Sequence, residues 1–399
     1  MKIHLITMGC KVNQVESEAL YRKLEERGFF MTEDPEEAEI TVLNSCVVTG
    51  HSEKKANRVL RKALETSKHV VAMGCFVPPQ DLVEKITIIG NEEKDHAADI
   101  ITELSGYRGE GVKSHYTQNT RAFLKIQDGC NQFCSYCIIP YMRGRERSLS
   151  LEEILKDVHY AVSEGQSEMV LTGIHLSGYG RDNGLSLIEV IEEVAKVEGV
   201  KRIRLGSLEQ GIITEEFLER STQLASFCDH FHLSLQSGSA SVLKRMNRHY
   251  TPEEYLETVK LIRRFYPRAA ITTDIIVGFP GETEEEFLET MDFVKEVRFS
   301  KVHLFSYSRR VGTKASLLKD HPSALKKDRL NRLKEVTEAL EIEYLESFVG
   351  DVEEVLVEEE YGHTKKYIQV YGDFKDRQGM FIPVQLLRRE GLALLGEEP

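Results

Sequence analysis

The chain of 399 residues lacks any apolar run that approaches the ~18 residues needed to form a membrane-spanning helix. It also lacks an excess of positive charge, because 52 lysines and arginines stand against 65 aspartates and glutamates, a net charge of −13. These two deficits exclude a helical membrane protein and a nucleic-acid binder that is basic throughout, whereas a local basic patch stays compatible. The first residues lack the pattern of a signal peptide, so we expect a cytoplasmic protein with no membrane partner.

Hydrophobic residues make up 41% of the chain and charged residues 29%, which is enough apolar material for folded cores. Residues 1–112 alternate short apolar runs with helical spacing, which predicts an amino-terminal Rossmann-like parallel α/β domain. A second alternation over 113–343 predicts a partial (β/α)6 barrel, a fold that places its chemistry at the carboxyl ends of its strands. Residues 344–399 predict a small antiparallel β-barrel. The polar stretch 105–119 is the predicted linker between the first two domains.

Cysteine is scarce, and its seven copies are better suited to metal binding than to disulfides in such a chain. Cys130, Cys134 and Cys137 form a C-x3-C-x2-C run directly after the first predicted barrel strand. Three thiolates at this spacing can hold three irons of a cubane cluster and leave the fourth iron open to a small molecule. A structural zinc site is the alternative, but such sites usually close with a fourth nearby ligand, and the nearest downstream histidine is His159.

Three further cysteines follow successive predicted strands of the first domain: Cys10, Cys46 and Cys75. The carboxyl ends of parallel strands meet at one edge of a sheet, where open α/β sheets bind ligands. We therefore expect a second three-thiol metal site there, with three inert buried cysteines as the alternative. Cys228 is left over and is expected to be structural.

Several motifs together resemble one family. Cys130–Cys137, with Tyr136 before the third cysteine, resembles the radical S-adenosylmethionine signature C-x3-C-x-aromatic-C. Other blocks resemble the methylthiotransferases within that superfamily, and the last of them resembles their terminal TRAM barrel: Met8–Gln14, Asn44–Thr49, Met73–Cys75, Cys137–Arg147, Asp274–Thr283, Tyr307–Ala315 and Gly350–Val384. The resemblance covers nearly the whole chain.

The first cysteine block distinguishes branches of this family. Gly9-Cys10-Lys11-Val12-Asn13-Gln14 is similar to the threonylcarbamoyladenosine tRNA branch. The isopentenyladenosine branch more often has Gly-Cys-Gln-Met-Asn, and the branch that acts on a ribosomal-protein aspartate has Gly-Cys-Pro-Lys-Asn. The resemblance implies insertion of a methylthio group at C2 of N6-threonylcarbamoyladenosine beside the tRNA anticodon. The alternatives are the other two substrates or a non-enzymatic, zinc-bearing RNA-binding module.

The resemblance also implies the cofactors, which would be two [4Fe–4S] clusters and S-adenosylmethionine. The cluster of Cys130, Cys134 and Cys137 would bind and cleave S-adenosylmethionine, and that of Cys10, Cys46 and Cys75 would deliver sulfur. An electron-donor protein such as flavodoxin or ferredoxin would be a partner beside the tRNA.

Candidate S-adenosylmethionine contacts lie at predicted strand ends or in the cysteine run. They are Tyr136, Gly173, Ser207, Glu209, Gln236, Arg248 and Gly278. Each also has an ordinary structural interpretation, as a hydrophobic prop, a turn or a surface polar group. Histidines 175, 232 and 303 are expected to be core or rim residues without a ligand role.

Candidate RNA contacts come from local basic and aromatic patches. They are Arg143, Arg145, Arg309, Lys365 and Tyr367. Arg143 and Arg145 follow the cysteine run directly, and 300–334 holds ten basic and two acidic residues. Lys365 and Tyr367 belong to a basic–aromatic strip in a terminal region that is otherwise acidic, so a purely structural role for that region is the alternative.

Overall fold

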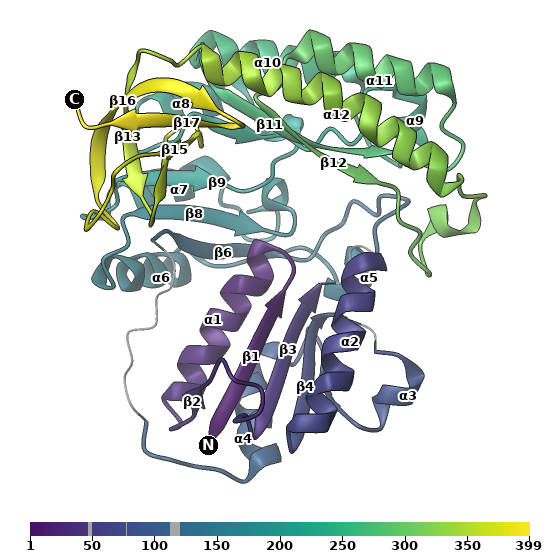
Figure 1. Cartoon of the computed structure of the whole chain (residues 1–399), viewed down its shortest axis with the longest axis vertical. Coiled ribbons are helices and arrows are strands. Elements are labelled where there is room, and N and C mark those ends of the chain that lie inside the picture. Colours follow the sequence, from purple (N-terminus) through teal and green to yellow (C-terminus); the bar gives the residue numbers. More distant parts are fainter. Residues whose placement is uncertain (47–49, 77, 112–119) are drawn as a thin grey trace.

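A computed structural model describes residues 1–46, 50–76, 78–111 and 120–399, so much of the predicted linker 105–119 lies outside the described residues. Figure 1 shows the order of the parts: an amino-terminal α/β unit lies on one side of a larger strand-and-helix unit, and a small barrel packs on the latter. This arrangement confirms the predicted fold class. The domain boundaries at 112 and 343 stay a prediction.

The amino-terminal unit is a parallel five-stranded sheet in the order β2-β1-β3-β4-β5. Its central strand β3 is buried at every position, as expected for a parallel strand covered on both faces. The strands are β1 (Lys2–Met8), β2 (Phe30–Met31), β3 (Ile40–Cys46), β4 (His69–Cys75) and β5 (Thr87–Ile89). The helices around it are α1 (Lys11–Glu25), α2 (Gly50–Thr66), α3 (Gln80–Val83), η1 (Lys94–His96) and α4 (Ala97–Ser105).

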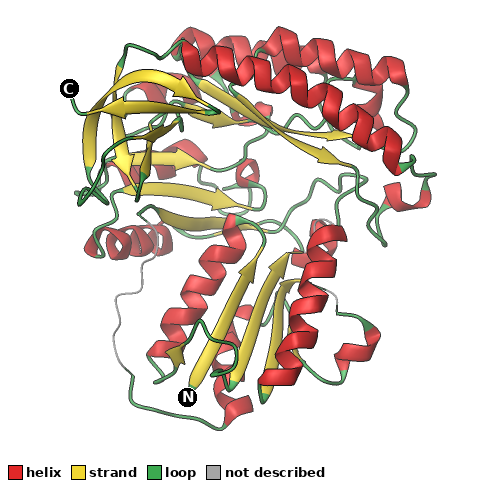
Figure 2. Cartoon of the chain, in the orientation of Figure 1, coloured by secondary structure: helices red, strands yellow, loops and turns green. Residues whose placement is uncertain are grey.

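The second unit is an open barrel made of two hydrogen-bonded sheets, β7-β6-β8-β9 and β10-β11-β12. An isolated bridge between Leu208 and Leu233 joins the two sheets, and the strands other than β7 run parallel. The strands are β6 (Ala122–Asp128), β7 (Arg147–Ser148), β8 (Glu168–Gly173), β9 (Arg202–Leu205), β10 (His230–His232), β11 (Ala270–Val277) and β12 (Lys301–Ser306). Figure 2 shows helices along the outer side of these strands.

Those helices cover the barrel because their apolar faces pack on the strands in one continuous core. Several begin with a capping box, such as Thr251 with Glu254 at the start of α10. They are α5 (Ile139–Arg143), α6 (Leu151–Ser163), α7 (Leu187–Ala195), α8 (Glu215–Thr222), α9 (Ala240–Arg245), α10 (Pro252–Phe265), α11 (Glu284–Val297) and α12 (Ser323–Glu346). Short 3-10 turns η2 (Leu176–Gly178), η3 (Gln210–Ile212) and η4 (Lys314–Leu317) follow strands β8, β9 and β12.

The carboxy-terminal unit is a closed barrel in the order β13-β14-β15-β17-β16. Its strands are β13 (Val352–Val357), β14 (Tyr361–Thr364), β15 (Gln369–Tyr371), β16 (Phe381–Glu390) and β17 (Ala393–Glu397). Strands β14 and β17 carry little strand signal in their sequences, because both contain glycine and neither is a continuous run of β-branched residues.

Two buried arginines of β9 fix the terminal barrel on the open barrel. Arg202 donates hydrogen bonds to the carbonyl oxygens of His363 (2.9 Å) and Glu354 (2.6 Å). Arg204 donates to those of Lys365 (2.9 Å) and Thr364 (3.1 Å). Hydrogen bonds to a charged donor contribute more than neutral ones, so this contact is expected to be rigid.

Candidate functional site

The thiols of Cys130, Cys134 and Cys137 share one loop after β6. Gly129 has φ +73°, and a Cβ there would lie 1.9 Å from a carbonyl oxygen of the returning chain, so only glycine fits. The Cys137 amide donates to the carbonyl of Cys134 (3.0 Å), and Asn247 donates to two further loop carbonyls. The loop is therefore held in a closed turn that brings the three cysteines together.

Burial is the main influence on the pKa of two thiols in this loop. It raises the pKa of Cys130 to about 11 and that of Cys137 to about 12. The guanidinium of Arg248 donates a hydrogen bond to Cys134 Sγ (3.4 Å). A metal must therefore displace protons from Cys130 and Cys137, and Arg248 supplies a nearby positive charge once thiolates form.

The other three cysteines come together at the carboxyl edge of the amino-terminal sheet. Cys46 and Cys75 end neighbouring strands and are partners in the β3–β4 register. Cys10 follows Gly9, at which a Cβ would lie only 2.4 Å from the Cβ of Cys46. The three loops are thus packed closely enough to share one ligand.

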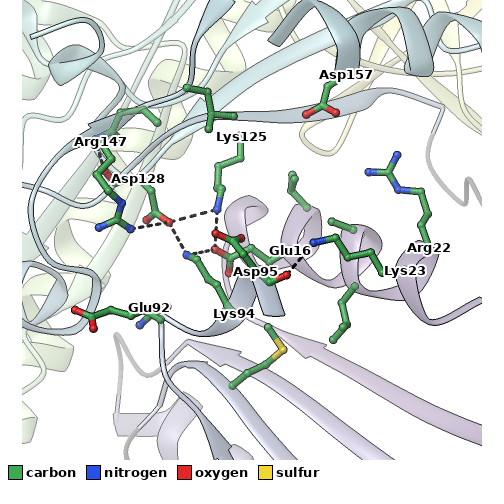
Figure 3. A pocket seen from close by; sticks show the side chains of 17 residues that line it. Glu16, Arg22, Lys23, Glu92, Lys94, Asp95, Lys125, Asp128, Arg147 and Asp157 are labelled. Atoms are coloured by element: carbon green, nitrogen blue, oxygen red, sulfur yellow. Dashed lines mark hydrogen bonds and ion pairs between the residues drawn. The ribbon is translucent and has the colours of Figure 1, made fainter. Parts of the chain in front are cut away.

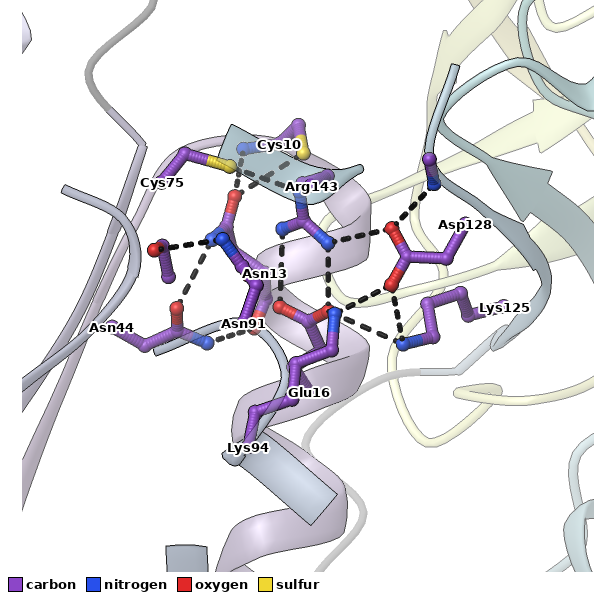
Figure 4. A network of polar contacts seen from close by, with 12 residues as sticks. Cys10, Asn13, Glu16, Asn44, Cys75, Asn91, Lys94, Lys125, Asp128 and Arg143 are labelled. Carbon is purple, nitrogen blue, oxygen red and sulfur yellow. Dashed lines mark hydrogen bonds and ion pairs between the residues drawn. The ribbon is translucent and has the colours of Figure 1, made fainter. Parts of the chain in front are cut away.

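Two buried amides hold these loops in place. Asn13 Oδ1 accepts a hydrogen bond from Cys10 Sγ (3.2 Å), and Asn13 Nδ2 donates to Asn44 Oδ1 (3.0 Å). A Cβ at Gly74 would lie 2.6 Å from Asn44 Oδ1, so this turn also requires glycine. Figure 4 shows Asn13 beside Cys10, with Asn44 next to Asn13.

Arg143 links the second thiol site to the open barrel. Its Nε donates to Cys75 Sγ (2.9 Å), and its Nη1 donates to Glu16 Oε1 (2.8 Å) and Asp128 Oδ1 (3.1 Å). Figure 4 shows the guanidinium between the sulfur and the two carboxylates. The side chain has no exposed surface in this arrangement, and the RNA contact by Arg143 stays a prediction. Its local basic run gave no sign that the carboxylate partners lie elsewhere in the chain.

Two lysines complete this network. Lys94 donates to Glu16 (2.6 Å) and Asp128 (2.5 Å), and Lys125 lies 3.2 Å and 3.3 Å from the same carboxylates. Burial alone raises the pKa of Glu16, but the hydrogen bond from Arg143 and the nearby cations outweigh it and lower that pKa to about 2. Burial also raises the pKa of Asp128, but the charges of Arg143, Lys125 and Lys94 outweigh it and lower that pKa. Both carboxylates are therefore ionised at neutral pH.

The chemistry of Cys75 differs from that of the first loop. A hydrogen bond from Cys46 lowers its pKa, burial opposes this, and the charge of Arg143 lowers it further, which gives a value of about 7. A thiol with this pKa is partly thiolate at neutral pH and is a good metal ligand.

A cavity of about 490 Å³ opens between the amino-terminal unit and the open barrel. Figure 3 shows that Glu16, Lys94, Lys125 and Asp128 form one of its walls. These carboxylates bind Arg143 and Arg143 binds Cys75, so the ion network lies between the cavity and the second thiol site.

Both trios fit a cubane cluster with three thiolate ligands. Each brings three thiols together from loops whose glycines leave no room for a side chain. Among the described residues, Cys130 also lies near Glu146 and His175, with ligand atoms within 4.8 Å. However, both ring nitrogens of His175 are engaged, at 2.7 Å from Glu146 and 3.2 Å from Glu209. These two contacts orient the His175 ring beside the cysteine loop.

Tyr136 and Gln236 line a second cavity of about 260 Å³ directly beside Cys137. Tyr136 packs edge-on against Phe279, with ring centroids 6.5 Å apart. Gln236 has φ +71°, an unusual conformation that directs the chain around the cavity. The space beside the first thiol loop is thus lined by two of the residues predicted to contact S-adenosylmethionine.

Two further candidates for that cofactor lie beside the thiol loop, outside this lining. Arg248 Nη1 is 3.0 Å from Glu209 Oε1, and Glu209 also accepts from Gln132 in the loop. Burial raises the pKa of Glu209, but the hydrogen bond from His175 and the charge of Arg248 outweigh it. This ion pair holds the guanidinium close to Cys134.

The remaining cofactor candidates do not line the cavity beside Cys137. Ser207 is exposed to solvent. A Cβ at Gly173 would lie 2.9 Å from the side chain of Gln127, and one at Gly278 would lie 2.4 Å from that of Lys326. For these two glycines, close packing is the role that the structure shows.

The RNA candidates other than Arg143 divide into two groups. Arg145 and Arg309 are exposed, and Arg145 lies over the ring of Phe133 in the cysteine loop (5.0 Å). Lys365 donates to the carbonyl of Ala225, and Tyr367 stacks on His363 (4.5 Å) against the open barrel. Both side chains contribute to the contact between the two barrels, and the RNA contact by Lys365 and Tyr367 stays a prediction.

Several polar residues of the site escaped the sequence analysis. Glu16, Lys94 and Asp128 form the ion network, and Lys11, Arg121 and Arg204 surround Tyr367. A local signal exists for Arg204, because β9 alternates arginine with apolar residues over Arg202–Leu205.

No helix in the described ranges is long and apolar enough to cross a bilayer. Two families match the chain: "Radical SAM superfamily" over residues 124–294 and "Uncharacterized protein family UPF0004" over residues 2–92. The first match contains the Cys130–Cys137 loop, and the second contains Cys10, Cys46 and Cys75.

Curated relatives extend over nearly the whole chain. The threonylcarbamoyladenosine tRNA methylthiotransferase MtaB of Bacillus subtilis is 36% identical, covering 96% of this chain and 93% of the relative. That of Aquifex aeolicus is 37% identical, covering 93% and 96%. The tRNA-2-methylthio-N(6)-dimethylallyladenosine synthase of Clostridium botulinum (strain Langeland) is 34% identical, covering 98% and 96%.

Among solved structures, the radical S-adenosylmethionine methyltransferase TsrM from Kitasatospora setae is similar, with a TM-score of 0.58 at 15% identity, covering 79% of this chain and 77% of that one. The cobalamin-dependent radical enzyme OxsB gives a TM-score of 0.53 at 14% identity, covering 85% and 56%. At these identities the likeness supports the fold alone.

Proposed function

Because the chain belongs to the radical S-adenosylmethionine methylthiotransferase family, we propose that it inserts a methylthio group at C2 of N6-threonylcarbamoyladenosine in tRNA, giving the 2-methylthio derivative. The enzyme uses S-adenosylmethionine and two [4Fe–4S] clusters. One observation carries the proposal: two separate thiol trios lie on facing parts of the molecule, and Arg143, six residues after Cys137, contacts Cys75.

We assign a different role to each of the two thiol trios. Cys130, Cys134 and Cys137 hold the cluster that binds S-adenosylmethionine, and the adjoining cavity lined by Tyr136 and Gln236 receives the rest of that molecule. The trio of the amino-terminal sheet holds the second cluster. Together the bound cofactors supply a carbon radical for hydrogen abstraction and the sulfur for insertion.

The polar groups at the two sites position these cofactors. Arg248, held by Glu209, places a cation beside Cys134 for the carboxylate of S-adenosylmethionine or the cluster charge. Arg143 offsets negative charge at Cys75. The buried lysine and carboxylate pairs keep the unit that carries the second trio fixed against the barrel that carries the first.

We propose a tRNA as the substrate-bearing partner and a flavodoxin or ferredoxin as the electron donor. Arg145 and Arg309, both exposed, are the proposed phosphate contacts, and Arg145 is next to the first thiol loop. Ser207, Gly173 and Gly278 remain proposals for S-adenosylmethionine binding through polar or backbone groups.

Nucleoside analysis of tRNA tests the substrate. A strain that lacks the gene should lose the 2-methylthio-threonylcarbamoyladenosine peak and regain it with the wild-type gene. Persistence of that peak contradicts the assignment. Loss of the isopentenyladenosine derivative instead would favour the second substrate, which the Clostridium relatives support. Loss of the methylthio group from a ribosomal-protein aspartate in that strain would favour the third substrate. If the anaerobically purified protein is colourless and holds stoichiometric zinc, it is not an iron–sulfur enzyme.

A further inference from the structure

Lys11 lies at the point where the three structural units meet. It is the first residue of α1 and follows Cys10 of the second thiol trio. Its side chain leaves the amino-terminal unit, and Nζ lies 5.2 Å from the ring centroid of Phe123 on β6. The same ammonium is 5.8 Å from the ring centroid of Tyr367 in the terminal barrel. One cation next to a cluster ligand therefore points into the open barrel.

The surroundings of this ammonium are rich in cations. The guanidinium carbons of Arg121 and Arg204 lie 5.2 Å and 4.8 Å from the centroid of the same Tyr367 ring. Three cations thus gather around one aromatic ring, and two of them, Arg121 and Arg204, are buried. The site thus carries a positive potential within a largely desolvated space.

The carboxylates nearby are engaged by other groups. Glu358 pairs with Arg121 (3.1 Å), and Glu168 pairs with Arg204 (2.8 Å). Within the described part of the chain, Lys11 forms no ion pair and no hydrogen bond, and Nη1 of Arg121 is buried without a hydrogen-bond partner. A desolvated cation without a counter-charge is unfavourable, so this arrangement is suited to an anionic ligand that arrives from outside.

The proposed substrate carries a matching anion. The threonylcarbamoyl group on N6 ends in a free carboxylate, and N6 is attached to the six-membered ring that also contains C2. Sulfur insertion must bring C2 beside the second thiol trio, hence beside Cys10, so the N6 group enters the space next to Lys11. The isopentenyl group is an uncharged hydrocarbon, so it can form neither an ion pair nor a hydrogen bond with an ammonium group.

We propose that Lys11 is a specificity-determining residue that binds the carboxylate of the threonylcarbamoyl group, with Arg121 as the neighbouring donor. This inference rests on the proposed function and deepens it. It also gives a physical meaning to the lysine after Cys10, where the block of the isopentenyladenosine branch more often has glutamine. A tRNA phosphate is the other possible anion, and the test separates the two.

The test measures binding of anticodon stem-loop RNAs to the cluster-loaded enzyme with saturating S-adenosylmethionine. The RNAs carry threonylcarbamoyladenosine, its carboxyl methyl ester, or unmodified adenosine. Wild type should bind the first about 10- to 100-fold more tightly than the second, since a buried hydrogen bond between charged groups is replaced by an unpaired cation. Lys11→Met should lose this difference, and Lys11→Arg should restore most of it. Lys23→Met, at an exposed position of the same helix, is the matched control and should behave as wild type.

Stability gives an independent readout. Lys11→Met removes an unpaired cation, so its melting temperature should equal or exceed that of wild type. A clear fall would assign Lys11 a structural role and overturn the proposal. Equal weakening of all three RNAs by Lys11→Met would show a phosphate contact and also overturn it, as would full discrimination by that variant. If wild type itself neither discriminates among the RNAs nor methylthiolates the first, the proposed function fails instead.

Discussion

The two thiol trios differ in how the fold brings their cysteines together and in what sets the pKa of the thiols. Cys130, Cys134 and Cys137 come from one short loop, and burial raises the pKa of two of them, to about 11 and about 12. Cys75 belongs to a trio gathered from separate strand ends, and its pKa is lowered to about 7, first by Cys46 and then by Arg143. The local site depends on loop geometry, whereas the dispersed site also depends on electrostatic support from the other unit.

The largest expected effect is at the local site. Cys134→Ala should abolish reductive cleavage of S-adenosylmethionine, because two thiolates cannot hold the cluster with its open iron. Production of 5′-deoxyadenosine by the anaerobically reconstituted protein measures this. Cys228→Ala, which removes a buried cysteine outside both trios, is the control and should retain cleavage. Undiminished cleavage by the Cys134 variant would contradict the assignment of the first trio.

The second-largest effect separates the functions of the two trios. Cys46→Ala should retain 5′-deoxyadenosine formation, because the first trio is intact, but should form no methylthiolated nucleoside. Parallel assays of the two products on the same sample measure the separation. Normal methylthiolation by this variant would show that the dispersed trio is not a sulfur site.

The third effect tests the link between the units. Arg143→Met should lower the free energy of unfolding by about 3–5 kcal/mol, because Glu16 and Asp128 lose a fully buried cation. It should also reduce iron bound at the second trio, measured in a variant in which the first trio is replaced by alanine. Arg61→Met, which breaks an exposed ion pair with Asp81, is the matched control and should change stability little. Unchanged iron content would restrict Arg143 to a packing role.

The smallest effect concerns pH. Metal ligation requires thiolates, and a thiol with a lowered pKa is deprotonated at a lower pH. When the reconstitution pH is lowered from roughly 8 to 6, iron uptake should fall earlier in the protein that retains only Cys130, Cys134 and Cys137. The protein that retains only Cys10, Cys46 and Cys75 should load over a wider range. Iron and sulfide analysis measures both, and coincident profiles would remove the contrast.

The sequence was sufficient for features whose determinants are local. The spacing of the first cysteine run, the positions of Cys10, Cys46 and Cys75 at the carboxyl ends of strands and the strand–helix alternation all led to the observed architecture. The run 202–205 predicts a strand from its sequence and β9 occupies it, whereas the apolar run 232–235 also predicts a strand but β10 covers His230–His232. A short strand with histidines at both ends carries little of the usual apolar signal.

Features that depend on distant partners were not predictable in this way. Arg143 belongs to a basic run, and its burial follows from Glu16, which is 127 residues away in the sequence. Lys365 and Tyr367 resemble an RNA-binding strip, but the carbonyl groups of 363–365 accept hydrogen bonds from Arg202 and Arg204 of β9. Local charge shows that a cation is present, and only the tertiary fold shows whether protein or solvent neutralises it.

The contact of Tyr367 with the open barrel has a consequence for radical chemistry. A carbon radical that forms in the open barrel survives only if stray hydrogen donors and bulk water are kept out. Since the terminal barrel packs on the open barrel where Arg204 and Tyr367 meet, a chain cut after residue 350 would expose this side of the open barrel to solvent. We expect such a protein to consume S-adenosylmethionine without forming the methylthiolated product. The last fifty residues would thus keep cofactor cleavage coupled to product formation.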